Sequence, residues 1–438
     1  MQDGARTSLP GAGNPEPGTA PTPHERNRGA GYSTGSMTLR ASLVALLSAT
    51  PFLASAAEAP PCPDCGLREI RIASKVLGEA RVARVRLPEG YEGAGGRYPV
   101  IYVLDGPEHL DHTSATAAYL ARQGVMPRVI VVSVLNVDRN RDFTPSRGGL
   151  GPRPMPTSGG ADRFLGFLRE ELVPAVNGNF RTERFRVLSG HSLGGLFALH
   201  VLASAPDAFD AYLAASPSAD WDDGLVVKEL ARRLQGPARL DRSLYVSLGD
   251  EKELAPGFER LGTALGSASP PGFRWRAARF PEDGHGLVPL PTTVQGLRFT
   301  FDGYLPPLDP DTGRYAGSLE DLEAHYRALS TRLGYQVLPP EGLVNLLGYQ
   351  RLGEGRIGEA VAAFQANVLR HPGSANAHDS LGEALEASGR LADAASAYER
   401  AVELGEATGS RLLPEYRKHL RAAQRRLGEP AAPPGIGR

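Results

Sequence analysis

The amino-acid sequence predicts a protein of the α/β class, in which a mostly parallel central sheet flanked by helices is followed by an all-α domain of helical repeats. Two observations predict this division. From Glu69 to about Tyr304, short β-rich runs alternate with amphipathic helical stretches, the pattern of a sheet sandwiched between helices. After Tyr304 the β-rich runs stop, and a pattern of small and aromatic residues recurs at a spacing of 34 residues.

Six stretches between residues 68 and 304 have the composition of strands: 100–104, 129–135, 185–189, 211–216, 243–249 and 273–280. The first two are continuous apolar runs, as strands buried on both faces require. Two earlier runs, 69–74 and 80–88, have no helix between them, so they predict an antiparallel hairpin at the edge of the sheet. Helices are expected over 162–173 and 193–203.

The C-terminal region repeats a set of positions after 34 residues: Leu347-Gly348, Gly355, Ala360 and Phe364 return as Leu381-Gly382, Gly389, Ala394 and Tyr398. This pattern resembles tetratricopeptide repeats. We expect a linker and a helix over 305–339, repeats with a capping helix over 340–427 and a disordered tail over 428–438. Two repeats are fewer than usually stand alone, so we expect them to pack on the sheet domain, on a partner protein or on a second copy.

The composition is that of an ordinary globular protein. The 438 residues are 41% hydrophobic and 22% charged, which allows one large domain and a smaller one. The formal net charge is -1, whereas nucleic-acid binding normally needs a basic surface. We therefore expect no nucleic-acid partner.

Residues 37–56 have the order of a secretory signal peptide, with Arg40, an apolar run over 41–53 and small residues at 54–56. The run is shorter than the roughly 20 residues that span a bilayer. We therefore expect export to the periplasm or the medium without a stable membrane span, with a retained anchor as the alternative. Residues 1–36 lack apolar periodicity, so we expect the chain to start at Met37 and this tail to be untranslated or disordered.

We expect residues 57–67 to form a linker, which carries the two cysteines of the chain, Cys62 and Cys65. Export favours a local disulfide between them, and two idle thiols are the alternative. A redox role would need a strand before the pair and a helix beginning at it, and a zinc site would need further ligands. The sequence offers neither, so no metal is expected.

The motif Gly-x-Ser-x-Gly occurs twice, as GYSTG around Ser33 and as GHSLG around Ser192. With 52 glycines in the chain, a match arises readily by chance. The sequence predicts neither a strand before Ser33 nor a helix after it. Ser192 lies between an expected strand and an expected helix, the context that exposes a nucleophilic serine. We therefore expect Ser192 to be a nucleophile, with the amide of Leu193 stabilising an oxyanion.

A serine nucleophile needs a base and an orienting carboxylate, in this fold in the chain order Ser, acid, His. His285 lies in a loop directly after the last expected strand and is the single histidine between residues 251 and 300. The acid belongs at the end of the strand 243–249, where Asp250, Glu251 and Glu253 are candidates. Spacing alone does not choose among them.

These motifs together resemble the Putative esterase family of α/β-hydrolases, which includes esterase D-like and ferric-siderophore esterases. The likeness covers about residues 68–304 and rests on YVLDG, GHSLGGL, SPS followed by Trp221, the acid after Gly-Asp, and the His-Gly loop. It implies an α/β-hydrolase fold, no cofactor, and Glu251 as the acid. It also implies a second oxyanion donor in the loop DGPEH. Because Pro107 has no N–H, Gly106 or Glu108 must donate there, or the oxyanion hole is weaker.

The loop over 136–154 follows the carboxyl end of an expected strand, where parallel sheets bind ligands. Arg141 and Arg147 are candidates to contact an anionic or catecholate-type substrate, and Trp221 is a third candidate contact. The alternative is that the arginines pair with carboxylates of the same loop.

The sequence thus predicts an exported serine hydrolase that cleaves small-molecule carboxylic esters through an acyl-enzyme, with a siderophore-type ester as a candidate substrate. One alternative is an acyltransferase of the same fold, in which an alcohol other than water takes the acyl group. Another is a catalytically weak scaffold whose helical repeats bind a partner protein, an alternative that Pro107 favours.

Overall fold

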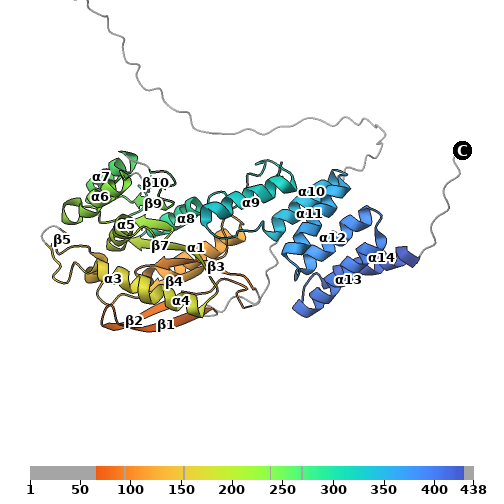
Figure 1. Cartoon of the computed structure of the whole chain (residues 1–438), viewed down its shortest axis with the longest axis horizontal. Coiled ribbons are helices and arrows are strands. Elements are labelled where there is room, and N and C mark those ends of the chain that lie inside the picture. The colour runs from red at the N-terminus through yellow and green to blue at the C-terminus, as the bar shows by residue number, and fades with distance from the viewer. Residues whose placement is uncertain (1–65, 93–94, 151–152, 237, 268–269, 429–438) are drawn as a thin grey trace, which may run out of the picture. The chain divides into compact units, whose positions relative to one another are not determined.

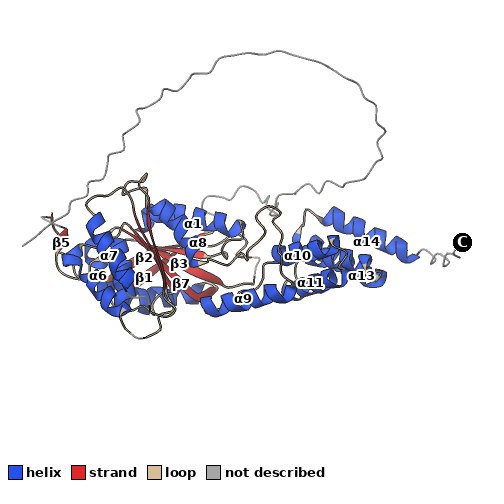
Figure 2. Ribbon diagram, turned by 90° about the horizontal axis from the view of Figure 1, so that it is seen from above, coloured by secondary structure: helices blue, strands red, loops and turns tan. Residues whose placement is uncertain are grey.

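An eight-stranded sheet lies between two layers of helices (Figures 1 and 2). The structure is a computed structural model that describes residues 66–92, 95–150, 153–236, 238–267 and 270–428. The predicted signal peptide, the start at Met37, Ser33 and the pair Cys62 and Cys65 lie outside the described residues. So does the tail expected at the C-terminus, apart from its first residue.

The strand order is β1-β2-β4-β3-β7-β8-β9-β10. The strands span β1 Leu67–Ser74, β2 Glu79–Arg86, β3 Tyr98–Val103, β4 Ile130–Val134, β7 Thr182–His191, β8 Ala211–Ala215, β9 Ser243–Leu248 and β10 Arg274–Arg279. The hairpin β1–β2 pairs antiparallel with β4, and the strands from β4 to β10 are parallel. The predicted mostly parallel sheet and its edge hairpin are confirmed.

Alternate residues of the central strands enter two apolar clusters, one on each face of the sheet. Val100 and Tyr102 of β3 belong to the first cluster, and Ile101 and Val103 belong to the second. This alternation follows from the two-residue period of a strand, and it explains the continuous apolar run in the sequence. The first cluster includes α3 (Ala161–Phe167), α4 (Val173–Asn179), α5 (Leu193–Ser204), α6 (Trp221–Leu234) and α7 (Ala255–Ser267), and the second includes α1 (Gly106–Arg122) and α8 (Pro289–Thr300).

Two connecting segments differ in detail from the sequence prediction. The helix expected over 162–173 contains a π-helical turn, Leu168–Leu172, between α3 and α4. Pro174, which cannot donate a helix hydrogen bond, follows this turn. The loop expected over 136–154 contains the short helix α2 (Arg139–Phe143) and a small hairpin of β5 (Gly149–Leu150) and β6 (Arg153–Pro154).

The region after α8 is helical throughout its regular elements, as predicted. It contains α9 (Leu319–Leu333), α10 (Glu341–Gly353), α11 (Ile357–Arg370), α12 (Ala375–Ala387), α13 (Leu391–Thr408) and α14 (Leu413–Gly428). The second apolar cluster of the sheet also includes residues of α9 and α10. Among the described residues, no helix combines the length and apolarity that a bilayer span requires.

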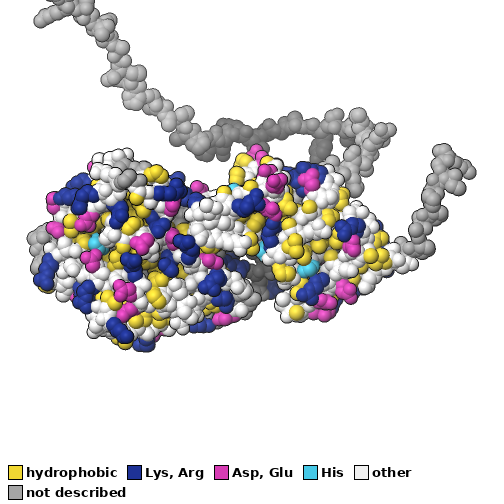
Figure 3. Space-filling view, in the orientation of Figure 1, with side chains coloured by type: hydrophobic (Ala, Val, Ile, Leu, Met, Phe, Trp, Pro, Cys, Tyr) yellow, Lys and Arg dark blue, Asp and Glu magenta, His cyan; other side chains and the backbone are white. Residues whose placement is uncertain are grey.

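Two glycines explain the 34-residue spacing of the helical pairs. A Cβ added to Gly348 would lie 2.5 Å from the ring of Phe364, and one added to Gly382 would lie 2.5 Å from the ring of Tyr398. In each pair of helices, an aromatic ring of the second helix therefore fills the space that a side chain at the glycine of the first helix would need. Basic and acidic side chains are interspersed on the face seen in Figure 3, and neither sign dominates it.

Candidate active site

Ser192 forms a one-residue turn between β7 and α5. Its φ of 60° and ψ of −116° lie in a region that residues other than glycine rarely adopt. A Cβ on Gly190 would lie 2.2 Å from the carbonyl oxygen of Gly194, so the turn requires glycine at position 190. The Ser192 N–H donates to the carbonyl oxygen of Ala215 at 2.9 Å, which ties the turn to β8. The strand-turn-helix context predicted for Ser192 is confirmed.

His285 and Glu251 lie in the loops that follow β10 and β9. Nδ1 of His285 is hydrogen-bonded to Oε1 of Glu251. Oε2 of Glu251 accepts hydrogen bonds from the hydroxyl of Ser216 and, at 3.1 Å, from the N–H of Gly249. The side chain of Glu251 is 9% exposed and that of His285 is 46% exposed. A nearly buried carboxylate, fixed at both oxygens, therefore orients an accessible imidazole.

The structure distinguishes among the three carboxylates that spacing in the sequence left open as candidates for the acid. Asp250 and Glu253 are exposed to solvent, whereas Glu251 is bonded to His285. The imidazole of His285 also lies against that of His191, with ring centroids 4.3 Å apart. Because His191 directly precedes Ser192, this contact brings the base candidate to the serine turn.

The backbone at the start of α1 narrows the choice of a second oxyanion donor. The N–H of Glu108 donates to the carbonyl oxygen of Asp105 at 3.1 Å, inside the turn. Pro107 has no N–H, so the amide of Gly106 is the one left in the predicted pair. Gly106 is buried against Ser133, whose Oγ would lie 2.3 Å from a Cβ at this position. Leu193, the first residue of α5, is also buried.

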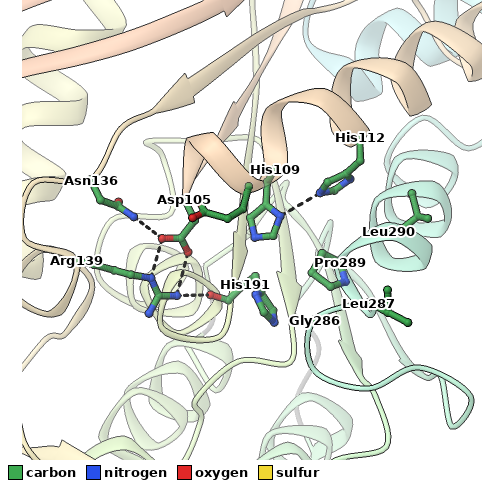
Figure 4. Close-up of a pocket in the computed structure, with 11 residues that line it drawn as sticks. Asp105, His109, His112, Asn136, Arg139, His191, Gly286, Leu287, Pro289 and Leu290 are labelled. Atoms are coloured by element: carbon green, nitrogen blue, oxygen red, sulfur yellow. Dashed lines mark hydrogen bonds and ion pairs between the residues drawn. The ribbon is translucent and has the colours of Figure 1, made fainter.

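A cavity of about 440 Å³ opens beside the serine turn (Figure 4). Asp105 lies at one end, where it accepts hydrogen bonds from Nδ2 of Asn136 at 2.5 Å and from Nε and Nη2 of Arg139 at 2.7 and 2.9 Å. Nη2 of Arg139 also donates to the carbonyl oxygen of His191 at 3.2 Å. The negative charge of Asp105 is thus matched by the guanidinium beside it.

Three histidines line the same cavity. Nδ1 of His109 lies 3.1 Å from Nε2 of His112, and the ring of His109 also contacts that of His191 at a centroid distance of 5.5 Å. Burial, with the neighbouring histidines as a smaller cause, lowers the pKa of His191 to about 3 and that of His112 to about 4. Burial also lowers the pKa of His109. These rings are therefore neutral near pH 7.

Several known proteins are similar to this chain. Residues 74–252 match the family model described as Putative esterase. Ferri-bacillibactin esterase BesA of Bacillus subtilis is 31% identical over 227 residues, which cover 46% of this chain and 78% of that protein. The chain belongs to the Putative esterase family. A siderophore enterobactin esterase of Emericella nidulans is 34% identical over 189 residues, covering 38% of this esterase and 62% of the relative.

Solved structures also resemble the esterase. An IroE-like serine hydrolase from Shewanella oneidensis has a TM-score of 0.60 and 26% identity, and the likeness covers 69% of this chain and 98% of that one. A protein from Capnocytophaga ochracea has a TM-score of 0.58 and 20% identity over 81% of this chain and 99% of its own. That share is too large for the sheet and its covering helices alone, so the likeness in fold extends into the helices after α8. The esterase has the α/β-hydrolase fold and is a carboxylic ester hydrolase.

Two residues expected at the substrate are instead part of the framework of the esterase. Nη2 of Arg141 donates to Glu79 at 2.6 Å, and its Nε donates to Asp142 at 2.9 Å. Trp221 is fully buried, and its Nε1 donates to Oγ of Ser146 at 3.0 Å. Arg147 is exposed in the same loop, and its contact with substrate stays a prediction.

The histidines that line the cavity were not predicted from the sequence. His109 and His112 are three residues apart, which places them on one face of α1. That spacing, directly after the Asp-Gly turn, was the available signal. His191 occupies a variable position of the Gly-x-Ser-x-Gly motif, and the motif assigns no role to that position.

Proposed function

We propose that the esterase cleaves its substrate through a Ser192, His285 and Glu251 triad and an acyl-enzyme intermediate. The observation that carries this proposal is the hydrogen bond between Glu251 and Nδ1 of His285, in a ring packed on the residue that precedes Ser192. With Nδ1–H held by the carboxylate, Nε2 of His285 is the nitrogen that can take up a proton.

In the first half-reaction, Nε2 of His285 takes the proton of Ser192 Oγ while Oγ attacks the acyl carbon. The bond between the acyl carbon and the alcohol oxygen then breaks, and the imidazolium returns the proton to that oxygen. In the second half-reaction, a water gives a proton to Nε2 and attacks the acyl carbon. The bond to Ser192 breaks, the serine regains the proton and the carboxylic acid leaves.

Three groups stabilise charge during both half-reactions. Glu251 stabilises the imidazolium and keeps its orientation. The amides of Leu193, at the N-terminus of α5, and of Gly106 are the proposed donors to the oxyanion. The strained φ of Ser192 supports this assignment, because such a turn presents a hydroxyl and a helix N-terminus to the same point.

As substrate we propose a siderophore-type ester, since the two relatives reported above are named ferri-bacillibactin esterase and siderophore enterobactin esterase. We also propose that the protein acts after export, in the periplasm or outside the cell. The order of basic, apolar and small residues over 37–56 supports export.

Replacement of the serine tests the mechanism. Ser192→Ala should abolish release of p-nitrophenol from p-nitrophenyl butyrate and hydrolysis of a triscatecholate lactone, while its circular dichroism spectrum stays that of the wild type. A fluorophosphonate probe should label the wild type and not the variant. Activity retained by the folded variant would remove Ser192 from the mechanism.

Product analysis with added alcohols distinguishes hydrolysis from acyl transfer. If water is the natural acceptor, free acid should remain the main product when ethanol or glycerol is added at millimolar concentration. A new ester formed in preference to the acid would make the protein a transferase.

A further inference from the structure

The three histidines of the cavity form a continuous wall, which we call the imidazole wall: His112, His109 and His191. The centroids of neighbouring rings are 5.2 and 5.5 Å apart, and the interplanar angles are 81° and 86°. These are the edge-to-face arrangements that aromatic rings prefer. His191 in turn lies against His285. The imidazole wall therefore leads from the first turns of α1 to the proposed catalytic base.

Apolar side chains face the imidazole wall from the loop after His285 and from the start of α8 (Figure 4). Leu287 is 64% exposed and Leu290 is 50% exposed, whereas Pro289 between them is buried. Large apolar side chains with half or more of their surface in water favour an apolar contact. They flank the cavity next to the reacting centre, so a substrate group can supply that contact.

The charges around the cavity favour an uncharged group. Arg139 and Asp105 compensate each other through two hydrogen bonds, and burial holds the pKa values of the imidazole wall below the ordinary value. Glu108 is exposed at the rim, where water solvates its carboxylate. The volume of about 440 Å³ lies within the roughly 300–1,000 Å³ of small-molecule sites.

We propose that this cavity is a subsite for an uncharged aromatic ring of the ester, held between the imidazole wall and the side chains of Leu287 and Leu290. The ring gains edge or face contacts with the imidazoles and removes the two leucines from water. The inference rests on the proposed role of Ser192, because the subsite places the ring relative to that serine.

Two pairs of small esters test the subsite: ethyl phenylacetate against ethyl hexanoate, and benzyl acetate against hexyl acetate. The two esters of each pair differ in whether an aromatic ring is present. The ring is on the acyl side in the first pair and on the alcohol side in the second. Acid release in a pH-stat gives kcat/KM for each ester. The ratio of the aromatic to the aliphatic value in each pair is the quantity compared between variants.

His109→Ala changes the imidazole wall, and Leu290→Ser changes the leucine side of the cavity opposite it. Each of these two wall variants has a matched control. Tyr119→Ala removes a 57% exposed ring from α1 outside the cavity, and Leu369→Ser changes an 83% exposed leucine of α11. In at least one pair of esters, both wall variants should lower the ratio by about 2- to 10-fold, the worth of one aromatic contact. The control variants should keep the wild-type ratio.

The outcomes separate the subsite from the proposed mechanism. Leu290 is half exposed, so its variant reports on the subsite even where His109→Ala fails to fold. If the wild type hydrolyses these esters and the ratios in both pairs are the same in Leu290→Ser as in Leu369→Ser, the subsite is refuted while the mechanism stands. If fluorophosphonate fails to label the wild type and no ester is cleaved, the proposed mechanism itself fails.

Discussion

Glu251 holds Nδ1 of His285 with one carboxylate oxygen, and its other oxygen is held by Ser216 and Gly249. The carboxylate is nearly buried and the imidazole is close to half exposed. The orientation of an accessible ring therefore depends on a group that itself has little freedom to move. This dependence makes the acid the most informative position for a conservative substitution.

Glu251→Gln should lower kcat for p-nitrophenyl butyrate by about 10³- to 10⁴-fold, as loss of the triad carboxylate does elsewhere. The amide cannot stabilise the imidazolium, although its size is unchanged. Asp250→Asn and Glu253→Gln are the matched controls, because both carboxylates are exposed, and they should leave kcat unchanged. A large loss in Asp250→Asn with Glu251→Gln near wild type would assign the acid to Asp250.

Arg139→Ala should lower the free energy of unfolding by about 2–3 kcal/mol in urea denaturation. The side chain of Asp105 is 7% exposed, and without Arg139 it would keep one of its two side-chain partners, Asn136. The loss should fall below that of a fully buried pair because Arg139 is 32% exposed.

A double variant isolates the charge of Asp105. Asp105→Asn removes that charge and suits the positive φ of 51° at this position, so Asp105→Asn with Arg139→Ala should recover part of the stability. Arg68→Ala is the surface control, because Arg68 and Glu92 are 50% and 76% exposed, and it should cost less than about 1 kcal/mol. Equal losses in the single and double variants would contradict the argument.

Local patterns in the sequence were sufficient to predict the sheet and the serine turn. The run Val100 to Leu104 is apolar at every position because alternate residues enter the clusters on the two faces of the sheet. The glycines around Ser192 are needed because the turn leaves no room for a Cβ at position 190. Both features depend on residues that are close together in the sequence, so a local sequence pattern can predict them.

Features that depend on distant segments were not predictable in the same way. Spacing alone did not choose Glu251 over Asp250, because Glu251 is fixed by His285 and by Ser216, which come from other parts of the chain. The cavity joins residues of α1, the β4–α2 loop, the serine turn and the loop after His285. No local periodicity links these segments, so the grouping of the histidines around one cavity could be recognised only from the fold.

The partly buried histidines of the cavity should make the esterase less stable as the pH falls from about 6.5 toward 4. His112 has a pKa of about 4 in the folded protein and 6.5 ordinarily, so in that interval the unfolded chain binds more protons than the folded one. Stability is therefore complete above the unfolded pKa and is lost as the pH falls. The slope is at most about 1.4 kcal/mol per pH unit for each such histidine, and it is reduced because the ring is partly accessible.

His112→Gln isolates this effect from the carboxylates that also titrate in acid. Urea denaturation at pH 7.0, 6.0 and 5.0 should give a shallower fall in the free energy of unfolding for the variant than for the wild type. His378→Gln changes a histidine outside the cavity whose pKa burial lowers as well, and it should show a change of the same sign. Parallel curves for His112→Gln and the wild type would show that His112 is protonated equally in the folded and unfolded states.

Gly348→Ala and Gly382→Ala should each destabilise the helical region, although alanine is the better helix former. The new Cβ would lie 2.5 Å from the ring of Phe364 or of Tyr398, and overpacking of this kind costs about 1–3 kcal/mol. Gly358→Ala is the control, since nothing lies within 4 Å of its Cβ position in α11, and it should be neutral or stabilising by up to about 1 kcal/mol. The double variants Gly348→Ala with Phe364→Leu and Gly382→Ala with Tyr398→Leu should be more stable than the corresponding single alanine variants, because leucine is smaller than the aromatic ring and leaves room for the new Cβ.

Thermal unfolding followed by circular dichroism measures the stability of all of these variants. Equal stability of Gly348→Ala and Gly358→Ala would contradict the packing that explains the 34-residue spacing.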